Sequence, residues 1–395
     1  MSPGIWLFVL AILIVVMVHE SGHFLVAKHF GFKATQFFLG FGPTVWSFKR
    51  GETEYGVKAL PLGGFVKILG MNPYEDIAPE DRARTYGAKP AYQRALLLVA
   101  GSATHWVLAF LLLVGTSMTI GFPTGEATSR VAAVSTRIDG HPTAATELGL
   151  RPGDRIVGVG DEVTESWRQI TSYIREHGGA TAQFAIQRQD GATAMVEVEL
   201  GEAIFSRNGR PVAYAPPNEP LRALKAGETR GGFLGVEPEP EFETKGLIGA
   251  VGDSGRRTAE VTVLSVRGLG DLVGQIFGGE LLRAVTGDGA RELNEGPLGL
   301  VGASRLANDT IERGQYLQFI ALIVGFTVFV GMMNLLPLPP LDGGHLAVVA
   351  YEAVTGRNVD IRKLIPISAA VISFFILLFL AVLYLDLARP IRVPF

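Results

Sequence analysis

Four long apolar segments divide the chain and set the first expectation about its fold. They cover residues from about 4 to 30, 95 to 122, 316 to 336 and 365 to 387. Each is near or above the ~20 residues that an α-helix needs to cross a bilayer. The pattern predicts a polytopic α-helical membrane protein with four transmembrane helices.

The first apolar segment lies near the N-terminus, where a cleaved signal peptide is the alternative. No Lys or Arg precedes the run from Ile5 to Val18, and no small-residue cleavage site follows it. Apolar residues resume at Phe24 after two histidines and a glutamate. We therefore expect one retained helix.

The loops between the predicted spans differ in charge and length. Lys and Arg are frequent in the first loop (Lys28, Lys33, Lys49, Arg50, Lys58, Lys67, Arg82, Arg84, Lys89) and recur in the third (Arg357, Arg362, Lys363). The positive-inside rule assigns both loops to the cytoplasm. The long second loop, from Pro123 to about Gln315, is then extracytoplasmic, and so are both termini.

The first loop has the alternation of a β-hairpin from Val45 to Ile68, with a turn at Gly51. Gly63-Gly64-Phe65 continues the returning strand. The sequence predicts a β-hairpin region over about 34–70 on the cytoplasmic side. It is either an ordinary cytoplasmic hairpin or a membrane-associated one whose edge dips towards the bilayer.

The second loop contains Glu147-Leu148-Gly149-Leu150-Arg151-Pro152-Gly153-Asp154, followed by a strand, which resembles the glycine-rich turn of a PDZ domain. A helix from Ser166 to about Glu176 and strands at about 182–188 and 194–200 complete an inserted α+β domain over 128–202. A PDZ domain binds an extended peptide or protein segment at a sheet edge.

The rest of the second loop, 203–314, is expected to be an extracytoplasmic linker. Residues 203–260 are rich in Gly, Pro and charge and predict loops, with one strand at 233–236. Residues 271–285 predict a short amphipathic helix at the membrane surface.

Composition narrows the chemistry. Hydrophobic residues make up 48% and charged residues 18% of the 395 residues, whereas an average soluble domain has roughly 25% charged residues. The net charge of −3 and the lack of a basic tract indicate no nucleic-acid partner. Cysteine is absent, so a transition-metal site must use His, Asp or Glu.

The first apolar segment contains His19-Glu20-Ser21-Gly22-His23. Residues four apart share one helix face, so both imidazoles can bind one metal ion while Glu20 holds a metal-bound water. Ionisable residues inside a membrane are functional by default. The alternative is a polar patch satisfied by neighbouring helices.

A third ligand is needed, and Asp342 is the best candidate. It follows the third span in Asn334-Leu335-Leu336-Pro337-Leu338-Pro339-Pro340-Leu341-Asp342-Gly343-Gly344-His345, where prolines end the helix. Irregular backbone at membrane depth is tolerated where it is buried or lines a wet cavity. His345 is the rival ligand and His105 a more distant one, and a simple turn aspartate is the alternative.

These motifs resemble those of bacterial site-2 proteases, the intramembrane zinc proteases of regulated intramembrane proteolysis, in the compact actinobacterial form with one PDZ domain. The resemblance covers nearly the whole chain and includes Gly296-Pro297-Leu298-Gly299 before the third span. One departure is Gly101-Ser102-Ala103-Thr104-His105, where the family usually has Gly-Pro-x-x-Asn in its second span.

The resemblance implies a Zn2+ cofactor held by His19, His23 and Asp342, with Glu20 as catalytic base. It also implies that Asn334 steadies the oxyanion or the substrate backbone. The hairpin segment at Gly63, Gly64 and Phe65 resembles the family's membrane-associated β-region, which implies that it pairs with the unwound substrate strand.

The implied function is cleavage of transmembrane segments of single-span proteins in the inner, or plasma, membrane, with trimmed anti-sigma factors as the expected substrates. The active site would lie towards the cytoplasm, across the bilayer from the PDZ domain. An inactive scaffold that presents the PDZ domain is one alternative, which the intact Glu20 disfavours. A metal transporter is another, and four spans with one ion site fit it poorly.

Overall fold

The structure is a computed structural model that describes residues 2–72, 74–164, 166–286 and 297–390. The chain forms two compact units, a helical one from Met1–Met118 and Lys245–Phe395, and a β-rich one from Thr119–Thr244.

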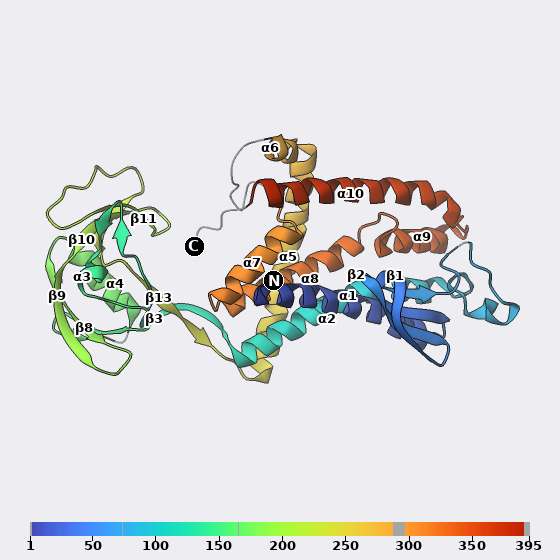
Figure 1. The fold of residues 1–395 in the computed structure, drawn as a ribbon, viewed down its shortest axis with the longest axis horizontal. Coiled ribbons are helices and arrows are strands. Elements are labelled where there is room, and N and C mark those ends of the chain that lie inside the picture. Colours follow the sequence, from blue (N-terminus) through green and yellow to red (C-terminus); the bar gives the residue numbers. More distant parts are fainter. Residues whose placement is uncertain (1, 73, 165, 287–296, 391–395) are drawn as a thin grey trace. The chain divides into compact units, whose positions relative to one another are not determined.

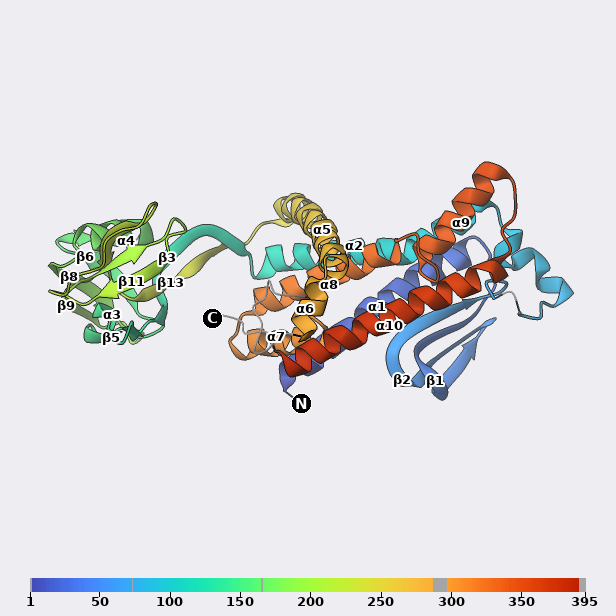
Figure 2. The same cartoon turned by 90° about the horizontal axis from the view of Figure 1, so that it is seen from above.

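Among the described residues, four helices of the helical unit are long and apolar enough to cross a membrane. They are α1 (Pro3–His29), α2 (Ala91–Thr119), α8 (Tyr316–Asn334) and α10 (Ile365–Ala388). The axes of these four helices are broadly aligned in Figures 1 and 2. α8 and α10 are apolar over most of their surface, and so is α1 apart from the His19–His23 motif and its last turn, as expected of helices surrounded by lipid and by one another. The prediction of four apolar helices is confirmed.

Further helices complete this unit. They are α5 (Leu247–Phe277), α6 (Glu280–Thr286), α7 (Leu300–Glu312), α9 (Asp342–Thr355) and the 3-10 turns η1 (Pro79–Arg84), η2 (Tyr86–Ala88) and η3 (Ile361–Leu364). Of the motif predicted to approach the third span, Gly296 lies outside the described residues, and Gly299 caps α7 rather than α8.

The loops predicted up to residue 260 are wrong from Leu247 onwards, because α5 is a 31-residue helix that begins there. Residues 271–285 are helical as predicted, but they are divided between the end of α5 and α6. The glycines of α5 lower helix propensity, and packing offsets that deficit. α5 contacts α8, and the Trp106 indole on α2 donates to the Thr262 hydroxyl at 3.0 Å. α5 runs steeply across the other helices in Figure 1.

The predicted hairpin is present as β1 (Ala34–Arg50) and β2 (Thr53–Ile68). It folds over on itself, because Phe38 pairs with Gly56 on one side and with Phe65 on the other. Gly40 and Gly42 have φ of +89° and +83° in the bend of β1, a region that favours glycine. The second half of β2 therefore becomes an edge of a small curved sheet.

The β-rich unit has a sheet in the order β13-β3-β6-β8-β9, with β7 beside β6. Its core is made by fully buried side chains that include Ile156, Ile170 and Phe184. These strands are β3 (Phe122–Val134), β6 (Arg155–Val159), β7 (Glu162–Val163), β8 (Thr181–Gln187), β9 (Thr193–Glu199) and β13 (Val236–Glu243), and the helices are α3 (Ala144–Glu147) and α4 (Trp167–Glu176). α4, β8 and β9 lie within a residue of their predicted positions.

The loops predicted after residue 202 are also wrong over much of the range up to Thr244. A three-stranded sheet, β11-β10-β12, occupies much of it. Its strands are β10 (Gly201–Phe205), β11 (Pro211–Ala215) and β12 (Thr229–Phe233), and a small pair, β4 (Arg137–Ile138) and β5 (His141–Pro142), also belongs to the unit. The strand predicted at 233–236 is interrupted, because Gly235 has a φ of +88° and separates β12 from β13. Glycine and proline in these short strands hide their alternation.

Candidate metal centre

The two histidines of α1 form the first half of a candidate metal site. His19 and His23 are one helical turn apart, and their Nε2 atoms are 3.1 Å from each other. The His23 side chain is buried. Its Nδ1 is 2.8 Å from the carbonyl oxygen of Leu97 on α2, to which it donates. That bond places the proton on Nδ1 and leaves the Nε2 lone pair free.

Asp342 supplies the second half from the first turn of α9. α8 ends at Asn334, and the proline-rich connection turns back against the start of α9. A Cβ on Gly343 would lie 2.2 Å from the Leu335 carbonyl oxygen, and one on Gly344 would lie 2.4 Å from the Pro339 nitrogen. These two glycines allow the close approach that brings the carboxylate to α1.

The three side chains fit a zinc ion. Asp342 Oδ2 is 3.4 Å from His19 Nε2 and 3.2 Å from His23 Nε2. Two ligands of a tetrahedral zinc ion with bonds of about 2.0–2.1 Å are separated by about 3.3 Å. Asp342 Oδ2 is moreover buried and has no hydrogen-bond partner within the described part of the chain, which is unfavourable unless a cation satisfies it. Two imidazoles and one carboxylate also leave a fourth position for water, as in catalytic zinc sites.

Glu20 lies beside this group, against the edge of β2. A Cβ on Gly64 would be 3.2 Å from Glu20 Cγ, and the backbone of Val66 interacts with the Glu20 carboxylate. The hairpin segment Gly63–Phe65 therefore reaches the metal centre. The Phe65 ring stacks on Phe38 with centroids 5.7 Å apart, which holds the segment in the sheet.

The other candidates lie around this group. Asn334 is half-buried at the last residue of α8, where the connection to Asp342 begins. Within the part of the chain that the structure describes, the metal-binding group consists of His19, His23 and Asp342, and His345 is not in it. His105 on α2 contacts His19 from behind, with Nε2 3.1 Å from His19 Nδ1. From the sequence, His105 was only a distant candidate ligand. The sequences of two helices do not show which of their faces meet, so the contact between His105 and His19 could not be predicted.

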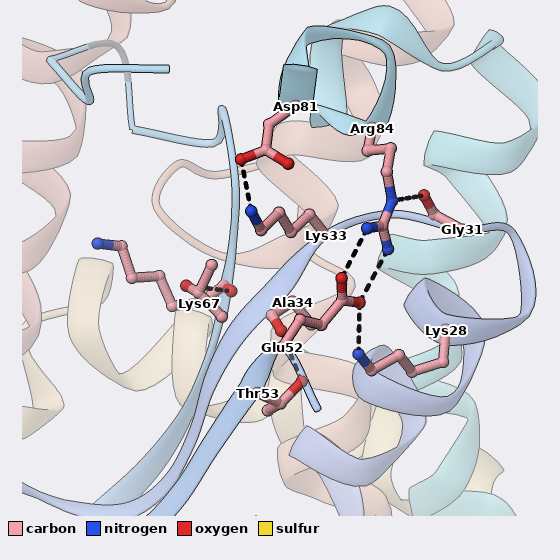
Figure 3. Close-up of polar contacts among 10 residues, drawn as sticks. Lys28, Gly31, Lys33, Ala34, Glu52, Thr53, Lys67, Asp81 and Arg84 are labelled. Carbon is pink, nitrogen blue, oxygen red and sulfur yellow. Dashed lines mark hydrogen bonds and ion pairs between the residues drawn. The ribbon is translucent and has the colours of Figure 1, made fainter. Parts of the chain in front are cut away.

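A charged cluster fixes the hairpin to the end of α1 (Figure 3). Glu52, in the hairpin turn, accepts from Lys28 at 2.7 Å and from both Arg84 terminal nitrogens at 2.6 and 2.8 Å. These bonds lower the pKa of Glu52 to about 2, and the bonds from Arg84 have the largest effect. Lys33 and Asp81 form a neighbouring ion pair. The cluster positions the strand that reaches Glu20.

Fold and site together define a class, the multi-pass membrane metallohydrolases with a two-histidine, one-carboxylate centre. Comparison with known proteins gives the family. The family model of peptidase family M50 matches residues 7–380 of this chain. The chain therefore belongs to peptidase family M50, the site-2 proteases, and is a zinc metalloendopeptidase.

Individual relatives agree over nearly the whole chain. The zinc metalloprotease Rip1 of Mycobacterium tuberculosis (strain ATCC 25618 / H37Rv) is 32% identical over 98% of each chain. The zinc metalloprotease RasP of Geobacillus kaustophilus is 27% identical over 95% of each chain. The metalloprotease MmpA of Caulobacter vibrioides is 31% identical over 89% of this chain and 86% of its own.

Proposed function

We propose that this metalloprotease cleaves the transmembrane segments of single-span membrane proteins. The observation that carries the proposal is the position of the metal-binding group. His19 and His23 lie within an apolar helix of membrane-spanning length, and Asp342 closes the group from a connection that follows another such helix. A hydrolytic centre in that setting meets peptide bonds that are embedded in the bilayer.

His19, His23 and Asp342 would hold the zinc ion, which when bound lowers the pKa of a water ligand to about 7 and polarises a carbonyl oxygen. The Glu20 carboxylate accepts the proton of the attacking water and returns it to the leaving amine nitrogen. The Asn334 side-chain amide donates to the substrate carbonyl oxygen or its backbone. Each role uses a donor or acceptor that the side chain has.

The β2 edge offers a place for the substrate. A transmembrane helix shields its own peptide bonds, so the substrate must unwind locally and lose backbone hydrogen bonds. Residues 64–67 pair with β1 on one side, and among the described residues no strand pairs with their other side. An unwound substrate segment that pairs there would regain hydrogen bonds. Gly63 and Gly64 carry no side chain that would block this approach to Glu20.

The charge of the loops supports a membrane orientation with the metal centre towards the cytoplasm and Thr119–Thr244 outside. We place a PDZ domain over 128–202, between membrane parts at 1–122 and 315–395, with 203–314 as the extracytoplasmic connection. The sheet of this domain continues beyond those bounds to the edge strand β13, to which a peptide or protein ligand can add. Trimmed anti-sigma factors in the inner membrane are the substrates that we expect.

Glu20→Gln tests the catalytic proposal. In nanodiscs with a single-span substrate, we expect cleavage to fall about 10²- to 10⁴-fold, with zinc content unchanged. Ser21→Ala is the matched control, because the Ser21 hydroxyl donates to the Met17 carbonyl of its own helix at 2.6 Å. Cleavage by Glu20→Gln at the wild-type rate would overturn the role of Glu20. Wild-type protein that binds the substrate without cleaving it would favour the scaffold instead.

A further inference from the structure

α2 contacts the metal-binding histidines along a single stripe. Leu97, Gly101 and His105 are four residues apart, so they share one helix face. The Leu97 carbonyl accepts from His23, Gly101 leaves room for the His23 ring, and His105 meets His19. α2 thus supplies no ligand but touches both imidazoles.

The direction of the contact between His105 and His19 defines what each nitrogen does. His19 Nε2 faces His23 and Asp342, so His19 Nδ1 points away from the metal position. A metal-binding imidazole coordinates through a nitrogen without a proton, and the proton then lies on the other nitrogen. His19 Nδ1 therefore carries N–H, and His105 Nε2, 3.1 Å away, accepts it.

His105 is held in place from its other side. Its side chain is only 1% exposed. Gly331 on α8 makes room for it, because a Cβ at position 331 would lie 2.7 Å from His105 Cβ. A buried imidazole confined between two helices has little freedom to turn, so it can fix the ring that it contacts.

We propose that His105 is a positioning residue for zinc binding, which accepts the His19 N–H and aims His19 Nε2 at the ion. It is not itself a ligand, since its Nε2 lies behind the His19 ring. The inference rests on the proposed metal centre. Partners of this kind usually are carboxylates, backbone carbonyls or water, and their loss weakens metal affinity about 10- to 100-fold.

Zinc affinity of the full-length protein in nanodiscs tests the proposal, measured by competition with a chelator. His105→Leu removes the acceptor, and we expect about 10- to 100-fold weaker binding and an altered visible spectrum of the cobalt-substituted protein. His105→Gln restores an acceptor oxygen at a similar reach and should bind within about threefold of wild type. Ser102→Ala is the matched control, because Ser102 is equally buried on α2 and its hydroxyl has no hydrogen-bond partner among the residues that the structure describes.

Two results would overturn the role of His105. One is wild-type affinity in His105→Leu. The other is a loss in His105→Gln as large as in His105→Leu, since the acceptor would then be irrelevant. Failure of the metal centre itself is visible separately, because His19→Ala would in that case bind zinc as wild type does.

Discussion

The His23 imidazole occupies space that is free only because residue 101 is a glycine. A Cβ built on Gly101 would lie 2.1 Å from His23 Nε2, 2.5 Å from Cε1 and 2.7 Å from Cδ2. Non-bonded carbon atoms rest about 3.5–4.0 Å apart. Gly101→Ala therefore requires the imidazole to move by about 1 Å or more.

Such a movement removes the ligand. The ring is buried and its Nδ1 is bound to the Leu97 carbonyl, so it cannot move without losing that bond. Metal–ligand distances tolerate only about 0.2 Å of deviation. We expect zinc affinity to fall by more than the ~10- to 100-fold that an outer partner contributes, and cleavage to fall with it. Folding should survive, because alanine favours a helix by about 0.5–1 kcal/mol over glycine.

The assay is zinc content per chain after dialysis, together with the rate of substrate cleavage. Gly115→Ala is the matched control, since it makes the same change on the same helix, where an added Cβ would have no atom of the described residues within 4 Å. It should retain zinc and activity. Gly101→Ala with one zinc per chain and wild-type cleavage would refute the reasoning, because His23 could not then be a ligand in the arrangement described.

Three further predictions concern the surroundings of the site. Asp342→Asn should lose zinc in metal analysis and His345→Ala should retain it, and the reverse result would make the latter the ligand. Gly331→Ala should weaken zinc binding by pushing on the imidazole that faces it, so unchanged chelator competition would contradict that packing. Glu52→Gln should speed amide hydrogen exchange in the hairpin turn, because it weakens the bonds from Lys28 and Arg84. Because the pKa of Glu52 is lowered from 4.5 to about 2, its stabilising effect is complete above pH 4.5 and lost as the pH falls through about 2. Equal protection factors at pH 6 and pH 2, each taken relative to the intrinsic exchange rate at that pH, would count against it.

The strongest parts of the fold could be read from the sequence because they depend on local pattern. The ends of α1, α2, α8 and α10 lie within four residues of the predicted spans, since continuous apolar runs have no other stable form in a bilayer. The hairpin turn at Gly51 could likewise be predicted from the alternation of the flanking strands. His19, His23 and Asp342 were predicted separately, and the structure brings them together.

The parts that the sequence did not predict depend on contacts between distant segments. α5 carries glycines and charges that resemble a linker, and it is helical where it packs against α8. The double pairing of Phe38 with Gly56 and Phe65 likewise cannot be inferred from alternation, because each half of the hairpin reads as an ordinary strand. Tertiary packing determines both the helical conformation of α5 and the double pairing of the hairpin.

The contact between α1 and α2 shows why a departure from the family pattern can hide a role. A Cβ on Gly22 would lie 2.5 Å from the Ala100 carbonyl oxygen, just as one on Gly101 would collide with His23. Adjacent glycines on facing helices let the two backbones approach closely. Only at that spacing can Leu97 and His105, on either side of Gly101, both reach the imidazoles of α1. The packing of α1 against α2 and the geometry of the metal site therefore depend on the same two glycines. A larger residue at either position would disturb both histidines together.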